Sequence, residues 1–230
     1  MLTATSQICE PAAHPLPKEA SPQEAKPGLA GDCRLKPALL PKEASPPEAK
    51  PGAGRFPSAL LERFYSRAGL APPRLRVVRG EEVPQPYKSL LVHSTDMTPT
   101  LEGFHGQPIH LAVLSSERQD NVYWREVILR RADDSRPVEY GVIRICLAPL
   151  SAAAAKSVLE ERRPLGRILQ DEAVAHLSWP QAFFRVQADA RLSKLLDLRQ
   201  PAALYGRRNV LADGSRRLLA EVIEILPPWP

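Results

Sequence analysis

The chain has 230 residues, of which 43% are hydrophobic and 6% aromatic, with 25 prolines and a formal net charge of +5. This length and composition fit one domain with additional sequence better than two domains. The charge is too small for a nucleic-acid-binding surface, and no uncharged apolar stretch reaches the roughly 18 residues of a membrane span.

Cysteine usage and the N-terminal sequence indicate the compartment. Cys9, Cys33 and Cys146 are widely spaced and odd in number, which argues against a disulfide framework or a zinc site and favours a reducing environment. The N-terminus lacks the basic start and apolar run of a signal peptide. We therefore expect a cytoplasmic protein.

The first 55 residues are rich in proline and contain a duplicated 13-residue segment. Leu16–Gly28 recurs as Leu40–Gly52, with Pro47 in place of Gln23. Frequent prolines interrupt helices and strands, and few large apolar side chains are present to compensate the entropy of ordering. We predict a disordered tail over residues 1–55, acting as a spacer rather than a docking segment, and a folded domain over residues 56–230.

The folded domain is predicted to begin with a helix over residues 57–68, because large apolar residues recur there at helical spacing and Gly69 follows as a stop. A short strand is predicted over residues 89–93. Thr98, a favoured N-cap residue followed by proline, predicts a brief helix that ends at Gly106.

Alternating apolar residues then predict a series of strands with two helices inserted. The predicted strands lie around residues 109–113, 122–131, 138–147, within 175–186, 205–211 and 216–226. The helices are an alanine-rich one over residues 151–162 and a short one starting at Pro164. Asp213-Gly214 favours a type I′ turn between the last two strands. Strands joined by short loops pair antiparallel, so the predicted fold class is α+β, an antiparallel β-sheet flanked by helices.

Two charged residues lie on strand faces that otherwise have the pattern of a core. Alternation places Arg125 on an apolar side of residues 124–129, and Glu221 on an apolar side of residues 218–225. An unpaired buried charge is costly, so these side chains must pair with each other or with a ligand. One interpretation is therefore a structural Arg125–Glu221 ion pair between two strands.

The other interpretation is a pocket for a small carboxylated molecule. An arginine can hold a carboxylate through two hydrogen bonds, and a carboxyl group in an apolar pocket retains a proton near neutral pH. The predicted helix start at Leu165 would add free backbone N–H groups that favour an anion. No P-loop, dinucleotide-binding, nucleophile-elbow or zinc-protease motif occurs, and the histidines lack metal-ligand spacing, so no metal or cofactor is predicted.

From about Leu90 to Pro228 the sequence resembles the chorismate lyase family. The resembling stretches occur in the family's order: Ser94–Thr98, Trp124–Val127, Pro164–Arg167, and Leu204–Arg208 leading to Leu218–Glu221. The resemblance implies a small antiparallel sheet covered by helices that enclose the ligand. It also implies an enzyme that eliminates pyruvate from chorismate to give 4-hydroxybenzoate, as in ubiquinone biosynthesis, without metal or cofactor.

The resemblance also implies roles for individual residues. Carried over by position, Arg125 would hold the ring carboxylate, Met97 would line the pocket, and the Leu165 N–H would donate to a carboxylate. Glu221 would be the general acid beside the departing enolpyruvyl group. The partner would then be the small molecule chorismate, bound by a monomer that contacts neither nucleic acid nor membrane.

This chain departs from the family at one position. Some members carry a second pocket arginine where this chain has Val142, so Arg144, further along the strand, is the candidate for the missing charge. A rival interpretation is a non-catalytic domain that binds an aromatic acid, because the same fold resembles the effector-binding domains of bacterial transcription regulators. Those regulators carry a winged-helix domain ahead of it, for which residues 1–55 are too rich in proline. A weakened enzyme that only binds aromatic acids is a third interpretation.

Overall fold

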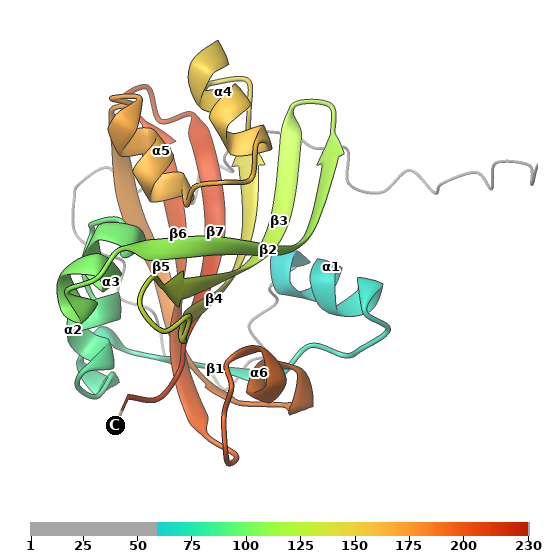
Figure 1. Ribbon diagram of the computed structural model, residues 1–230, viewed down its shortest axis with the longest axis vertical. Helices are drawn as coiled ribbons and strands as arrows, with labels where there is room; N and C mark the ends of the chain where they lie inside the picture. Colours follow the sequence, from blue (N-terminus) through green and yellow to red (C-terminus); the bar gives the residue numbers. More distant parts are fainter. Residues whose placement is uncertain (1–58, 230) are drawn as a thin grey trace, which may run out of the picture. The chain divides into compact units, whose positions relative to one another are not determined.

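The computed structural model describes residues 59–229, so the predicted tail over residues 1–55 lies outside the described residues. The described part is built on a seven-stranded sheet in which all neighbouring strands are antiparallel (Figure 1). The strands are β1 (Leu75–Val78), β2 (Ile109–Gln119), β3 (Val122–Arg131), β4 (Pro137–Cys146), β5 (His176–Gln187), β6 (Ala203–Asp213) and β7 (Leu218–Leu226). Their order is β1-β5-β6-β7-β4-β3-β2, which places the last strand in the centre of the sheet.

Helices connect the strands and cover the sheet. Those described are α1 (Ala59–Arg67), α2 (Tyr87–Leu91), α3 (Met97–His105), α4 (Ala152–Leu159), α5 (Leu165–Asp171) and α6 (Ala190–Leu195), with a 3₁₀ turn, η2 (Gly80–Glu82). The predicted fold class, α+β with an antiparallel sheet flanked by helices, is confirmed.

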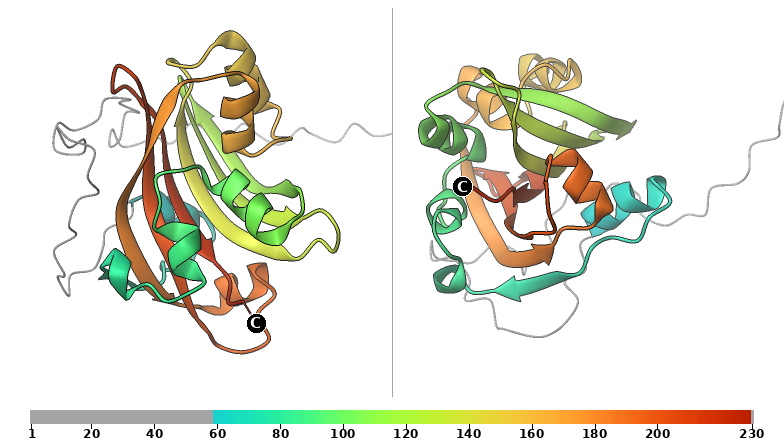
Figure 2. Two further views of the ribbon diagram at one scale, coloured as in Figure 1. Left: turned by 90° about the vertical axis from the view of Figure 1, so that its left-hand side faces the viewer. Right: turned by 60° about the horizontal axis from the view of Figure 1, so that its bottom comes forward.

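Both faces of the sheet are covered, by different helices. Helices α1 and α6 pack on one face, which we call the packed face, against a buried set that includes Trp124, Tyr140 and Ile223. Helices α2 to α5 lie over the other face, which we call the cavity face, and Figure 2 shows them on the same side of a strongly curved sheet. Each large apolar side chain buried in these layers stabilises the fold by about 1.5–3 kcal/mol.

The helix predicted over residues 57–68 is confirmed as α1, and the strand predicted over 122–131 is confirmed as β3. The strand predicted over residues 89–93 is wrong, because this segment lies largely in helix α2. Tyr87, Leu90 and Leu91 are all buried, and their spacing of three and four places them on one helical face.

Two local predictions differ in detail. Helix α3 begins at Met97 with Asp96 as its N-cap, so Thr98 is a buried first-turn residue rather than the cap. The loop after β6 is wider than a type I′ turn, because the residue with positive φ is Arg216 at 62° and not Gly214. The Asp213 carboxylate organises this loop by accepting hydrogen bonds from the backbone N–H groups of residues 215 and 217.

Candidate ligand-binding site

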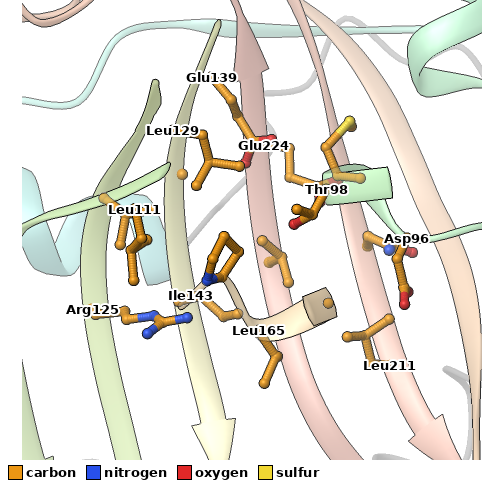
Figure 3. Close-up of a pocket in the computed structure, with 17 residues that line it drawn as sticks. Asp96, Thr98, Leu111, Arg125, Leu129, Glu139, Ile143, Leu165, Leu211 and Glu224 are labelled. Carbon is orange, nitrogen blue, oxygen red and sulfur yellow. The ribbon is translucent and has the colours of Figure 1, made fainter. Parts of the chain in front are cut away.

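A cavity of about 60 Å³ lies on the cavity face, between the sheet and the starts of helices α3 and α5 (Figure 3). Its walls are largely apolar and include Leu111, Leu129, Ile143, Leu165 and Leu211. A cavity needs about 10–15 Å³ to hold one water molecule, so this one has room for a molecule larger than water.

Arg125 projects into the cavity from the middle of β3. Alternation along the strand brings Val127 and Leu129 to the same cavity, as the sequence predicted for this face. The residue is 2% exposed, and its Nε and Nη1 atoms have no hydrogen-bond partner among the described residues. Nη2 lies 3.5 Å from the backbone oxygen of Arg163, and Tyr123 adds a side-chain hydrogen bond to the guanidinium.

Burial has the largest influence on the charge of Arg125. Burial lowers the pKa of its guanidinium below the usual value, although an arginine in a protein stays protonated. Tyr123 and Glu161 lie close enough to raise the pKa again, but their effect is smaller than that of burial. A buried cation that is only partly compensated costs free energy. A bound anion would remove this cost.

Two carboxyl groups occupy another part of the cavity, away from Arg125. Figure 3 shows Glu139 of β4 and Glu224 of β7 with their carboxyl groups close together. They are 4% and 5% exposed. Glu224 accepts a hydrogen bond from Arg207 of β6, whereas Oε2 of Glu139 has no partner among the residues that the structure describes. Burial, followed by the nearby Glu224 charge, raises the pKa of Glu139 well above its ordinary value.

Arg207 is fully buried and joins the carboxyl pair to the segment that precedes α3. Besides Glu224, its guanidinium donates to the backbone oxygens of Leu91, His93 and Thr95 at 3.1–3.2 Å. Since the start of α3 lines the cavity, Arg207 connects this part of the wall to Glu224 on the sheet.

Residues at the starts of α3 and α5 form the rim of the cavity. Asp96 and Gly166 line both this cavity and an outer hollow of about 530 Å³. Asp96 is held by His176 of β5, whose Nε2 lies 2.9 Å from Asp96 Oδ2 and whose Nδ1 lies 2.8 Å from the backbone oxygen of Val174. The hydrogen bond to Asp96 raises the pKa of His176, although burial opposes the shift.

The structure brings three of the predicted site residues together. Met97, at the start of α3, Arg125 and Leu165, at the start of α5, all line the cavity. Glu221 and Arg144 do not line it, and the expectation that Glu221 shares a chamber with Arg125 is wrong.

Glu221 lies on the opposite face of the sheet. On β7 the cavity-lining residues are Val222 and Glu224, so alternation turns Glu221 the other way. Its carboxylate pairs with Arg208 on β6, at 2.7 Å from Nη2 and 2.8 Å from Nε. The predicted structural pair between Arg125 and Glu221 is therefore wrong as well.

Arg144 is also excluded from the cavity by alternation. The cavity-lining residues of β4 are Glu139, Gly141 and Ile143, and Arg144 is the direct cross-strand neighbour of Glu221. Val142 is fully buried in the packed face. A second pocket arginine therefore cannot come from either position.

Sequence reasoning missed Glu139, Glu224 and Asn209. The two glutamates carried the same signal that singled out Glu221, a charge within an apolar strand. Asn209 is 2% exposed and lines the cavity, where its Oδ1 has no partner in the described chain, while its Nδ2 donates to Ser178 Oγ at 2.9 Å.

Residues 59–229 contain neither a metal-ligating cluster nor a membrane-spanning helix. No group of three metal-ligating His, Cys, Asp or Glu side chains occurs in this range. None of its helices is long and apolar enough to cross a membrane.

A scan of protein-family models finds no match, and a search of curated proteins finds none. Solved structures with a similar arrangement include PhnF from Mycobacterium smegmatis, with 12% identity and a TM-score of 0.44 over 59% of this chain and 64% of that chain. The chain thus spans slightly less than two thirds of that protein. The effector domain of the same PhnF matches with 12% identity and a TM-score of 0.44 over 57% and 88% of the two chains. A GntR-family transcriptional regulator from Enterococcus faecalis V583 matches with 14% identity and a TM-score of 0.38 over 50% and 91%. At these TM-scores the likeness carries no argument about function.

Proposed function

We propose that the chain binds a small carboxylated molecule in the cavity on the cavity face, with Arg125 as the partner of the carboxylate. The observation that carries this proposal is a buried guanidinium whose Nε and Nη1 face a cavity and have no partner among the described residues. Charge-assisted hydrogen bonds from an arginine to a carboxylate are among the strongest in proteins. The proposal corresponds to the ligand-binding alternative drawn from the sequence.

The charges of the cavity favour a ligand with a single carboxylate. Arg125 is the only cationic side chain among the residues that line it, and the acids Asp96, Glu139 and Glu224 also line it. A second carboxylate on the ligand would meet carboxyl groups and no free cation. Benzoate and its para-substituted relatives match this charge pattern and the apolar walls.

Calorimetric titration with 4-hydroxybenzoate tests the proposal. Arg125→Met should weaken binding by about 30-fold or more, the scale expected for truncating a buried charged partner. Arg208→Met is the matched control, because it removes an arginine that pairs with Glu221 outside the cavity, and it should leave the affinity unchanged. Equal affinity in the wild type and Arg125→Met would overturn the proposal.

Chorismate lyase activity is a second candidate, favoured by the carboxyl pair, although chorismate carries a second carboxylate for which the described residues that line the cavity offer no further cation. In this reaction the ether bond between the ring and the enolpyruvyl group breaks, the ring loses a proton and becomes aromatic, and the leaving oxygen gains a proton. A carboxyl group with a raised pKa in the same cavity is suited to donate that proton. The pair formed by Glu139 and Glu224 would then take the role that the sequence assigned to Glu221.

The two candidates differ in turnover. Purified protein is incubated with chorismate while pyruvate is measured and the aromatic product is identified. Release of pyruvate together with 4-hydroxybenzoate supports the lyase. Binding of 4-hydroxybenzoate with no pyruvate released leaves the ligand-binding function as the conclusion.

A further inference from the structure

We propose that Glu139 is a neutral hydrogen-bond donor within the cavity, which selects ligands that place an uncharged oxygen acceptor opposite their carboxylate. This inference deepens the proposed function and rests on it for the position of the ligand. It identifies a specificity-determining residue that the sequence did not single out.

The register of the sheet brings the two carboxyl groups together over a glycine. Gly141 of β4 lies directly opposite Glu224 of β7. A Cβ atom at Gly141 would lie 3.1 Å from Oε1 of Glu139, so the Glu139 side chain occupies the space above this glycine. Because position 141 carries no side chain, Glu139 can lie along the sheet beside Glu224.

Arg207 lies beside the two carboxyl groups and donates a hydrogen bond to Glu224. Arg207 donates from Nε to Glu224 and from its two terminal nitrogens to backbone oxygens, so none of its donors is directed at Glu139. Two adjacent buried carboxyl groups cannot both ionise at ordinary pH. The proton therefore resides on Glu139, whose Oε2 is buried without a partner.

The charged groups around Glu139 support the same assignment. Glu224 faces it from β7 and raises its pKa, Arg207 on β6 lowers it to a smaller extent, and burial has the largest effect. Arg125 on β3 and Asp96 before α3 line other parts of the same cavity. The start of α5 contributes only Pro164, Leu165 and Gly166, which carry no charge.

The positions of Arg125 and Glu139 set the length of the ligand. Arg125 is paired with Ile143, and Leu129 is paired with Glu139, so the two residues are separated by four positions along the strands. At about 3.3 Å per residue this is roughly 13 Å between Cα positions. A para-substituted benzoate that makes a hydrogen bond of about 3 Å at each end has a comparable overall length, so one such molecule could contact both residues.

Two isosteric probes test whether Glu139 donates. 4-Methoxybenzoate presents an ether oxygen that can only accept a hydrogen bond, and 4-ethylbenzoate has the same shape without the oxygen. The wild type should bind the methoxy compound about 3- to 10-fold more tightly, the ratio for one net neutral hydrogen bond. Glu139→Gln, which donates through its amide, should keep this preference, and Glu139→Leu should lose it.

The pH dependence separates a neutral Glu139 from an ionised one. As the pH rises through the pKa of Glu139, the wild type should lose the preference for the methoxy compound, while Glu139→Gln should keep it. Glu224→Gln removes the charge that raises this pKa, so the loss should occur at lower pH. A wild type that prefers 4-ethylbenzoate near neutral pH, with the order reversed in Glu139→Gln, would overturn the inference.

Infrared difference spectroscopy gives a test that needs no ligand. A protonated carboxyl group has a carbonyl band that should be present in the wild type at neutral pH and absent in Glu139→Gln. If neither probe binds but the band is found, the proposed ligand has failed and the neutral Glu139 stands. If carboxylates bind through Arg125 but the band is missing, the inference about Glu139 has failed and the proposed function stands.

Discussion

Arg125 and Glu126 are neighbours on β3, yet they differ in how many hydrogen-bond partners the protein provides for their charged groups. Each is 2% exposed. On the packed face the Glu126 carboxylate accepts hydrogen bonds from Tyr140 Oη at 2.7 Å and from Arg191 Nη2 at 2.7 and 2.8 Å. On the cavity face the Nε and Nη1 atoms of Arg125 have no partner in the described chain.

This difference in hydrogen-bond partners distinguishes a charged group that stabilises the fold from a charged group that can bind a ligand. A buried charge with a complete set of partners is part of the framework, and removing one partner leaves the others uncompensated. A buried charge that leaves some of its donors without partners destabilises the protein unless a ligand supplies them. The same strand therefore carries a structural charge on one face and a binding charge on the other.

The largest effect on stability is expected at Glu126. Glu126→Ala should lower the free energy of unfolding by about 3–5 kcal/mol, because Arg191 and Tyr140 lose the carboxylate that they share. Urea denaturation measures this loss. Glu221→Ala removes a partly exposed ion pair and is the matched control. A loss at Glu126 no larger than that at Glu221 would show that the packed face does not depend on its charge cluster.

Arg125→Met should have the opposite effect on the empty protein. Methionine fills a similar volume without a charge, so the free energy of unfolding should stay the same or rise by roughly 1 kcal/mol or more. Urea denaturation without ligand is the measurement. A decrease of more than about 2 kcal/mol would place Arg125 in the structural framework, and the contrast with Glu126 would disappear.

Arg125 could be predicted from the sequence, but the carboxyl groups that share its cavity could not be assigned correctly. Alternation shows which residues of a strand share a face, but not which face of the sheet that is. On β7 nearly every residue is buried, because both faces are covered by helices. The apolar neighbours of Glu221 and those of Glu224 therefore give the same signal, and only the register through β4 places Glu224 on the side of Arg125.

The series of strands could be predicted better than the short elements around the cavity. Long alternating segments such as β3 have a clear period, whereas the five-residue helix α2 has too few residues to distinguish a helix from a strand. The four-residue edge strand β1 and the six-residue helix α6 were also missed. Helix α2 precedes the segment that Arg207 holds, so the attachment of this segment to the sheet was not predicted either.

Glu221→Gln should have a small effect, although the sequence assigned the general acid to this residue. Its side chain is 20% exposed and pairs with Arg208, which is 23% exposed. Partly exposed pairs of this kind contribute about 0–1 kcal/mol. The affinity for 4-hydroxybenzoate, measured by calorimetry, should equal that of the wild type. A tenfold weaker affinity would mean that the packed face influences the cavity.

The smallest effect is expected at the rim, where His176 holds Asp96. The pKa of His176 is raised from its ordinary value of about 6.5. The contribution of this pair to stability is therefore fully present below about pH 6.5 and is lost as the pH rises through the higher pKa of the folded state. The melting temperature of the wild type should exceed that of His176→Gln by the largest margin near pH 5.5, and the margin should shrink above neutral pH.

The wild type is compared with His176→Gln because two other histidines change the stability with pH in the opposite direction. Burial lowers the pKa values of His93 and His105, so their contributions to stability are lost as the pH falls. These contributions cancel in the difference between the wild type and His176→Gln. Asp96→Asn should remove the pH-dependent part of that difference, because the amide carries no charge to attract the imidazolium. A margin that is constant from pH 5.5 to 8 would show that the rim is held by packing alone rather than by a titratable pair.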